Sequence, residues 1–100
     1  YETYQPAVLR MIRDVCKAAG KAGITVGMCG EAAADPALTP CLIAFGLDEF
    51  SVSAEKVLAT RKNISLWSSE DAIAVADKVM SLGTAEEVKQ YLDSVKKEGE

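Results

Sequence analysis

The sequence predicts an α/β fold built around one parallel βαβ unit that belongs to a larger sheet or barrel. Two short strand-like segments, residues 24–28 and 50–53, lie on either side of a helical pattern. Two strands joined through a helix form a parallel βαβ unit, which is right-handed in nearly all proteins. A parallel sheet of two strands would leave both edges open, and so we expect further strands beside these two.

The first helix is expected to begin at Pro6, whose missing N–H is harmless in a first helical turn. Apolar residues then recur at helical spacing and predict a buried face: Val8, Leu9, Ile12, Val15, Cys16 and Ala19. The opposite side of the helix carries basic residues: Arg10, Arg13 and Lys17. Gly20 and Gly23 are expected to end this helix.

The segment 24–28 is apolar at nearly every position, which is the pattern of a strand covered on both faces. Downstream, Asp35 is expected to cap a helix whose first residue is Pro36. The apolar face of that helix is predicted from four residues: Leu38, Cys41, Leu42 and Phe45. Gly46 is expected to end it, and Pro40 is expected to kink it or loosen its first turns.

Three further helices are expected after the second strand, the first of them brief, over residues 55–60, followed by a connection at 63–67. The other two begin at patterns that resemble capping boxes, Ser68-x-x-Asp71 and Thr84-x-x-Glu87. Their predicted buried faces are Ile73, Ala76 and Met80 in the first, and Val88, Tyr91, Leu92 and Val95 in the second. The C-terminal end of the last helix is suited by two cations: Lys96 and Lys97.

Composition limits the class of protein. The chain has 100 residues, enough for one domain or a piece of a larger one, and a net charge of −4, which argues against nucleic acid or an anionic membrane surface as a partner. No apolar run approaches the roughly 20 residues of a membrane helix, and the first residues show no secretory signal pattern. Three cysteines and no histidine fit reduced thiols better than a disulfide scaffold or a zinc site. We therefore expect a cytoplasmic protein without membrane insertion.

Polar residues stand where the two predicted strands end. Cys29, Gly30 and Glu31 follow the first strand, and Ser51 and Ser53 belong to the second. In α/β proteins, functional groups gather at this carboxyl edge of the sheet. From the pattern alone, Cys29 is either a functional thiol or a small buried hydrophobe, and the two serines are either functional or strand filler. Cys16 and Cys41, on apolar helix faces, are interpreted as core residues.

Several other chemistries have little support. The chain holds no histidine that could activate a cysteine nucleophile, no CxxC pair for redox work, and no glycine-rich phosphate loop of the usual spacing. Glu31 can also be a solvated loop charge, and Gly30 a turn glycine.

Two motifs together carry a resemblance to a known family. "VGMCGEAAADP" and "GLDEFSVSA", with "QPAVLRMI" and "GKAGITVGMCGE" upstream in the same order, resemble the end of the phosphoenolpyruvate-binding barrel of enzyme I. Enzyme I is the phosphoenolpyruvate–protein phosphotransferase of the bacterial sugar phosphotransferase system. The resemblance covers about residues 5–80 closely, and the final helix more loosely. Pyruvate phosphate dikinase and phosphoenolpyruvate synthase share a similar cysteine motif and barrel, but the Asp-Glu-Phe-Ser form is more similar to enzyme I.

The resemblance implies that residues 1–100 are the C-terminal fragment of a TIM barrel, its last two βα units. It further implies that Cys29 is the general acid that protonates C3 of enolpyruvate after phosphoryl transfer from phosphoenolpyruvate to a histidine. Gly30 would let the backbone pass close to the substrate, and Glu31 would be a polar support beside it. The sequence departs from the family at Ala34, where a glycine is usual, and at Val52, where methionine is common. Ala34 would fit the loop only if its φ is negative.

The resemblance also implies that most of the catalytic groups lie outside this chain. A complete barrel of this kind needs roughly 250 residues. The phosphorylated histidine, the arginines that hold phosphate and the carboxylates that bind Mg²⁺ would all lie upstream. The phosphocarrier protein would bind through that missing N-terminal part, and the barrel would form a homodimer. The chain alone is therefore expected to be inactive.

A second hypothesis is a free-standing binding or regulatory module that kept the motif without the chemistry. An open reading frame of this length with its own start would favour that module. A coding sequence that continues upstream into barrel strands would favour the enzyme, and the first residue, Tyr1 and not Met, points toward the enzyme.

Overall fold

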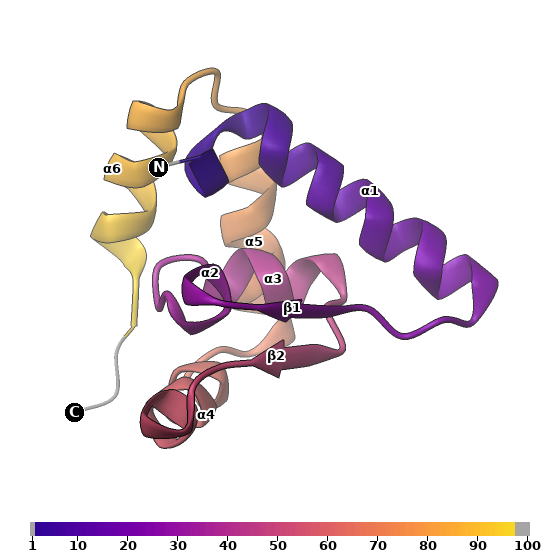
Figure 1. Ribbon diagram of the computed structural model, residues 1–100. Helices are drawn as coiled ribbons and strands as arrows, with labels where there is room; N and C mark the ends of the chain where they lie inside the picture. The colour runs from indigo at the N-terminus through magenta and orange to yellow at the C-terminus, as the bar shows by residue number, and fades with distance from the viewer. Residues whose placement is uncertain (1, 98–100) are drawn as a thin grey trace.

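The computed structural model describes residues 2–97 and shows helices packed around a small parallel sheet (Figure 1). Single-turn helices at Glu2–Tyr4 (η1) and Ala54–Lys56 (η2) each precede a longer helix. The remaining elements, in chain order, are α1 (Pro6–Ala22), β1 (Gly27–Cys29), α2 (Glu31–Ala34), α3 (Thr39–Phe45), β2 (Glu49–Ser51), α4 (Val57–Ser65), α5 (Ser69–Met80) and α6 (Ala85–Val95). The expected α/β class and the expected order of strand, helix and strand are confirmed.

The two strands are adjacent and parallel, as the sequence predicts. Their register pairs Gly27 with Glu49, Met28 with Phe50, and Cys29 with Ser51. A β-carbon on Gly27 would stand 3.3 Å from the Cβ of Glu49, so the close approach of the two backbones at this pair favours glycine. Both strands are shorter than expected, because β1 begins at Gly27 and not at Ile24, and β2 ends at Ser51 and not at Ser53.

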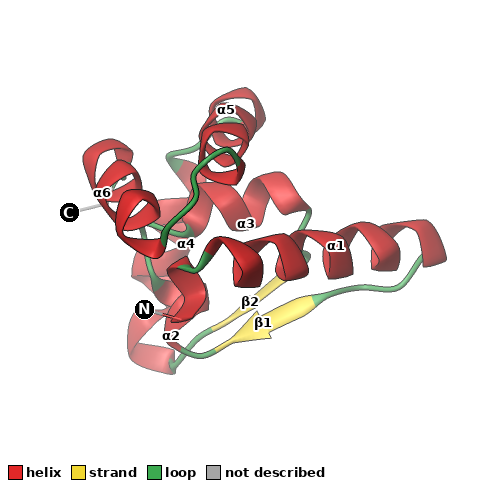
Figure 2. Cartoon of the chain, turned by 90° about the horizontal axis from the view of Figure 1, so that it is seen from above, coloured by secondary structure: helices red, strands yellow, loops and turns green. Residues whose placement is uncertain are grey.

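The expectation that the first strand is covered on both faces is wrong. Met28 and Phe50 are half-buried and pack against the core, whereas the alternate residues are exposed: Gly27, Cys29, Glu49 and Ser51. The physical reason is that α1, α3 and α5 lie on one side of the two strands (Figure 2). Ile24, before the strand, is 63% exposed. The sheet therefore has one covered face and one open face.

The hydrophobic core lies between α3, α1, α5 and α6. Its large fully buried apolar side chains come from these four helices and from Leu38, the residue before α3: Leu9, Leu38, Leu42, Val79, Val88 and Leu92. Each such side chain contributes about 1.5–3 kcal/mol when it leaves water. Helix α3 is thus the centre of the domain, and the short sheet lies against its edge (Figure 1).

Helix α1 begins at Pro6 as expected, and Gly23 ends it in the left-handed conformation, with φ of 71°. Gly20 lies inside the helix and does not stop it, contrary to the prediction. The predicted face is right at Leu9 and Cys16, which are buried, but wrong at Val15, which is 53% exposed. Val15 lies one position away from Cys16, and this rotation of about 100° carries it out of the contact with the core.

The start of the second predicted helix is wrong. Asp35 does not cap a helix at Pro36, because it begins a turn in which its side-chain Oδ1 accepts a hydrogen bond from the N–H of Ala37 at 2.9 Å. Helix α3 begins only at Thr39. Pro40 therefore falls in the first turn, where no N–H is needed, and neither kinks nor loosens the helix. Gly46 ends α3 in the left-handed conformation, as predicted.

The C-terminal helices begin where their capping residues predict. The hydroxyls of Ser68 and Thr84 accept hydrogen bonds from the N–H groups of Asp71 and Glu87, each at 3.1 Å. Helix α4 differs from the prediction, because it continues to Ser65, where a connection was expected.

The predicted buried face of α5 is right in part. Ala76 is buried and Met80 packs against the core, as predicted, whereas Ile73 is half exposed. The other buried positions of α5 are Ala72, Val75 and Val79. On α6, Val88 and Leu92 are buried and Tyr91 and Val95 pack against the core, which confirms the predicted stripe.

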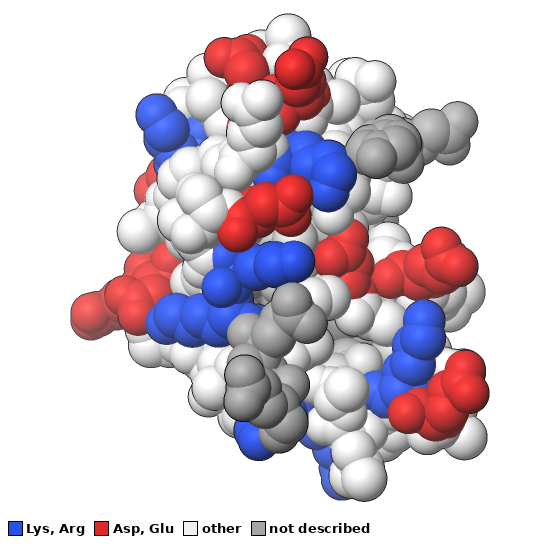
Figure 3. All heavy atoms as spheres, turned by 90° about the vertical axis from the view of Figure 1, so that its left-hand side faces the viewer, with Lys and Arg blue, Asp and Glu red and all other residues white. Residues whose placement is uncertain are grey.

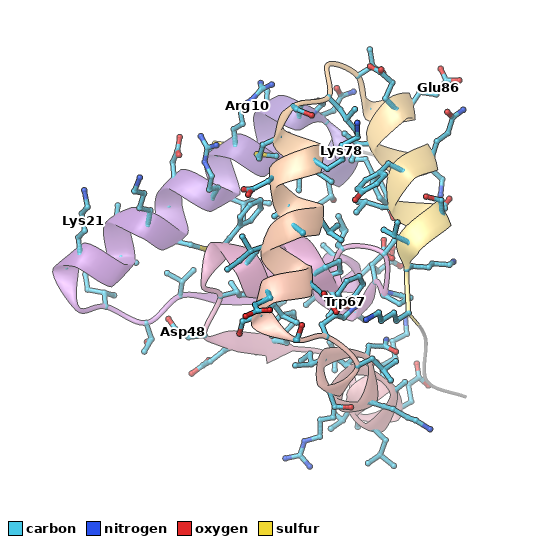
Figure 4. All side chains as sticks on the ribbon, turned by 180° about the vertical axis from the view of Figure 1, so that it is seen from behind. Arg10, Lys21, Asp48, Trp67, Lys78 and Glu86 are labelled. Atoms are coloured by element: carbon cyan, nitrogen blue, oxygen red, sulfur yellow. The ribbon has the colours of Figure 1, made fainter. Side chains whose placement is uncertain are left out.

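Lys97 ties the end of α6 to the start of α5. Its Nζ lies 4.5 Å from the centre of the Trp67 ring, donates to the carbonyl of Leu66 at 3.3 Å, and stands 3.6 Å from a carboxylate oxygen of Asp71. Figure 4 shows Trp67 at this junction, beside the C-terminal end of α6. These three contacts of Lys97 hold the C-terminal end of α6 against the segment in which α5 begins.

The surface over α6 mixes charges of both signs. Groups of acidic and of basic side chains are interspersed on this side of the molecule (Figure 3). Among the described helices, none has the length and apolar character that a membrane crossing requires.

Candidate functional site

Cys29 is the last residue of β1, and its partner in the sheet register is Ser51, the last residue of β2. Both residues are exposed, on the face of the sheet that the helices leave open. The structure thus brings together two of the polar residues that the sequence places at the carboxyl edge. Ser53, also exposed, follows two residues after the strand.

Gly30 makes the turn that separates Cys29 from the following helix. Its backbone has φ of 87° and ψ of −162°, a conformation that residues with a β-carbon rarely adopt. A β-carbon at this position would meet nothing within 4 Å, so the backbone conformation, and not lack of space, requires glycine. This sharp turn allows β1 to end at the exposed Cys29 and α2 to begin at Glu31.

Glu31 is the first residue of α2 and is exposed. It lines a pocket of about 280 Å³ whose other polar walls come from Thr3, Tyr4, Asp35 and Lys89. The pocket joins the N-terminal segment, the loop after β1, and α6. Sequence reasoning did not predict this convergence, because residues from three distant segments form it.

Ala34 fits the loop without strain. It is the last residue of α2, and none of the described residues other than glycine has a positive φ. The alanine that departs from the usual glycine is therefore compatible with the backbone found here.

The three thiols of the chain differ in exposure. Cys16 and Cys41 are buried, as the sequence predicts, and Cys29 is exposed. Burial raises the pKa of the Cys41 thiol to about 12. Burial, and to a smaller degree the charge of Asp48, also raises the pKa of Cys16. Of the three thiols, Cys29 is therefore the one that lies exposed on the open face of the sheet.

Asp48 clamps the other end of the two strands. Its carboxylate accepts a hydrogen bond from the N–H of Val26 at 2.8 Å, and its own N–H donates to the carbonyl of Val26 at 2.9 Å. The side chain lies at the entrance of β2, between this strand and the loop that follows α1 (Figure 4). Asp48 belongs to the "GLDEF" motif, and its role here is to fix the register that pairs Cys29 with Ser51.

Within residues 2–97, no group of three or more His, Cys, Asp or Glu side chains is arranged to hold a metal ion. The residues described here therefore do not fit a magnesium site of their own.

Comparison with known proteins gives a consistent result. Residues 1–68 match the family described as PEP-utilising enzyme, PEP-binding domain. The phosphoenolpyruvate-protein phosphotransferases of Bacillus sp. (strain S) and Geobacillus stearothermophilus are each 48% identical to this chain over 92 residues, which is 92% of the chain and 16% of each relative. The enzyme of the same name from Bacillus subtilis (strain 168) is 46% identical over 92 residues, again 92% of the chain and 16% of the relative.

The chain spans about a sixth of the length of these curated relatives. The family match covers more than half of the chain and includes both strands, the Cys29 turn and α3. The chain therefore belongs to the family of PEP-utilising enzymes that this PEP-binding domain defines.

Proposed function

We propose that this chain forms the last two βα units of a phosphoenolpyruvate-binding TIM barrel and that Cys29 is the general acid of the reaction. The observation that carries the proposal is the position of Cys29, exposed at the carboxyl end of a parallel strand on the open face of the sheet. In TIM barrels that end of the strands carries the active site. The open face of β1 and β2 would then face the barrel interior.

The chemistry suits a thiol. Transfer of the phosphoryl group from phosphoenolpyruvate to a protein histidine breaks the bond between phosphorus and the enol oxygen and leaves the enolate of pyruvate. The carbon C3 of that enolate then takes the proton of the Cys29 thiol, so that a C–H bond forms as the S–H bond breaks. The resulting thiolate regains its proton from water. An ordinary thiol is largely protonated at neutral pH and can act as an acid toward a strongly basic carbon.

Gly30 and Glu31 have supporting roles in this proposal. The turn at Gly30 would bring the backbone close to the substrate, and Glu31, two residues after Cys29, would provide a polar group beside the site. The pocket that Glu31 lines does not include Cys29. The relatives reported above carry the phosphotransferase name, which favours enzyme I over pyruvate phosphate dikinase or phosphoenolpyruvate synthase.

The remaining parts of the reaction belong, in this proposal, to other segments of a longer cytoplasmic enzyme. The sequence contains no histidine, so the phosphorylated histidine must come from elsewhere. The groups that bind phosphate and Mg²⁺, the phosphocarrier protein and the second subunit of a homodimer would also be engaged outside this segment. Incubated alone with phosphoenolpyruvate and Mg²⁺, the chain should form no pyruvate above background.

A chimeric enzyme tests the proposal. This chain would replace the matching segment of the Geobacillus stearothermophilus phosphotransferase, with which it shares 48% identity. We expect the chimera to form pyruvate from phosphoenolpyruvate. Cys29→Ala should lower the rate of pyruvate formation by roughly 10²–10⁴-fold, the usual effect of removing a positioned general acid. Binding of phosphoenolpyruvate should change much less.

The matched control is Cys41→Ala, which removes a buried thiol from the same chimera. Pyruvate formation and deuterium incorporation at C3 in deuterated water would be followed for each variant. A Cys29→Ala chimera that forms pyruvate at the unmodified rate contradicts the acid role. A well-folded chimera that binds phosphoenolpyruvate but turns over none of it would favour the binding-module hypothesis.

A further inference from the structure

Asp35 fixes the short helix that follows Cys29. Its N–H donates to the carbonyl of Ala32 at 3.3 Å and so ends α2. Its carboxylate accepts one hydrogen bond from the N–H of Ala37 and another from the hydroxyl of Tyr4. Its carbonyl accepts from the N–H of Leu38 at 3.1 Å and from the hydroxyl of Thr39 at 3.2 Å. The N–H, the carbonyl and the carboxylate of Asp35 thus all make hydrogen bonds that fix the conformation of the loop.

Tyr4 connects that loop to two other segments. It is the last residue of η1, separated from α1 by Gln5, and its half-buried ring packs against the core. The Nζ of Lys89, on α6, stands 5.3 Å from the centre of the Tyr4 ring. Lys89 is itself held by a 3.0 Å ion pair with Asp93, one turn along α6. Contacts therefore run from α6 through Tyr4 to Asp35 and the loop.

The loop is also held by packing, because Ala33 in the middle of α2 is fully buried. Cys29 is held on one side by its pairing with Ser51 in β2. On its downstream side the chain passes through Gly30 into α2, which has only four residues. Because the backbone of a single helical turn is rigid, a displacement at the Asp35 end of α2 also displaces its first residue, next to Gly30 and Cys29. The hydrogen bond from Tyr4 to Asp35 is made at the far end of this turn.

We infer that Tyr4 is a positioning residue for Cys29, acting through Asp35 and α2. The inference rests on the acid role of Cys29 proposed above. The hydroxyl of Tyr4 touches neither the thiol nor the substrate in this scheme. It fixes the angle at which α2 leaves the sheet, and with it the place of the thiol over the open face. A small displacement of a catalytic group costs roughly 10²-fold in rate, so the effect is measurable.

Tyr4→Phe tests the inference, because it removes only the hydroxyl and keeps the ring that packs against the core and Lys89. Tyr91→Phe is the matched control, since Tyr91 is also a half-buried tyrosine packed on the core. The first measurement is made on this chain by NMR. Tyr4→Phe should shift the amide resonances of Cys29 and Gly30 and speed hydrogen exchange at Ala37 about tenfold, while Tyr91→Phe should do neither.

The second measurement uses the chimeric enzyme. Tyr4→Phe should lower kcat roughly 10- to 100-fold with little change in KM for phosphoenolpyruvate or in the melting temperature. A general loss of stability would instead lower the melting temperature, and in that case the inference is wrong. It is also wrong if Tyr4→Phe leaves kcat, or the resonances of Cys29 and Gly30, as they are in the Tyr91→Phe variant. Failure of the acid role is recognised separately, because only then does Cys29→Ala retain full activity.

Discussion

Cys29 and Ser51 are opposed in the register of two parallel strands, each at the last position of its strand and each exposed on the same open face. This pairing makes the thiol accessible, since only a small hydroxyl-bearing side chain stands beside it. The two buried thiols, Cys16 and Cys41, have no such access.

Thiol labelling should follow this difference. In the folded chain, iodoacetamide should modify Cys29 at least about 100-fold faster than Cys16 or Cys41, because the buried thiols react only when the structure opens. Ser51→Phe should slow the labelling of Cys29, whereas Ser94→Phe, an exposed change on α6, should not. Mass spectrometry of digested samples gives the three rates. Equal rates for all three thiols under native conditions would contradict the burial described here.

Stability should fall at high pH through Cys41. Burial raises the pKa of this thiol from 9.0 to about 12, so between these values the folded state holds a proton that the unfolded state has lost. The free energy of unfolding therefore falls as the pH rises above 9, by up to about 1.4 kcal/mol per pH unit from this group. Below pH 9 the contribution is constant.

Urea unfolding with reductant present, from pH 7.5 to 10.5, measures this effect. Cys41→Ala should be less stable at pH 7.5 and should lose less stability with rising pH than the unchanged chain. Other groups titrate equally in both proteins and cancel. Parallel pH curves would show that Cys41 titrates normally in the folded state.

The cap of α6 should be worth about 1 kcal/mol. Thr84→Ala removes the oxygen that accepts from the N–H of Glu87 and should lower the free energy of unfolding by about 0.5–2 kcal/mol. Thr84→Ser keeps the oxygen and should recover most of the loss. Chemical denaturation followed by circular dichroism decides between them, and identical losses in the two variants would assign the effect to the methyl group instead.

The chain alone should self-associate through its uncovered surface near β1. Within the described residues the sheet has only two strands, and Met11, Val15 and Ile24 are each more than half exposed on or near α1 and β1. Open strand edges and apolar surface favour pairing with another copy. Sedimentation equilibrium at micromolar concentration should show species above the monomer mass, and the double variant Met11→Lys and Ile24→Lys should reduce them.

Leu58→Lys is the control, since Leu58 is 79% exposed on α4. If it disperses the chain as well as the double variant does, the association surface lies elsewhere. A single monomeric species for the unchanged chain, with a cooperative melt, would show that the chain closes its own core.

The features predictable from the sequence were those set by local chemistry. Ser68 and Thr84 cap their helices because an N-cap needs only a hydroxyl and the next turn of backbone. Gly23 and Gly46 end their helices because the residue after the last turn adopts the left-handed conformation, which glycine adopts at little cost in free energy. The carboxyl-edge position of Cys29 followed from the same local pattern, in which a short apolar run ends at a glycine.

Features that depend on distant packing could not be predicted. Asp35 is as good an N-cap as it is a turn residue, and the turn prevails here together with the contact to Tyr4, 31 positions away. The exposure of Ile24 and Val15 depends on which helices cover which face, and periodicity carries no such information. The pocket that contains Glu31 is hidden from the sequence for the same reason.

The turn at Gly30 has a consequence for chemical synthesis. The mirror image of its backbone conformation, φ of 87° and ψ of −162°, is φ of −87° and ψ of 162°, an ordinary extended conformation for an L-residue. A D-amino acid therefore adopts the Gly30 conformation naturally, and D-alanine there would reduce the freedom of the unfolded chain without straining the folded one. Cys29, immediately before it, is the residue that native chemical ligation requires at a peptide junction. The chain can thus be assembled from peptides 1–28 and 29–100, with the mirror-image residue placed one position after the seam.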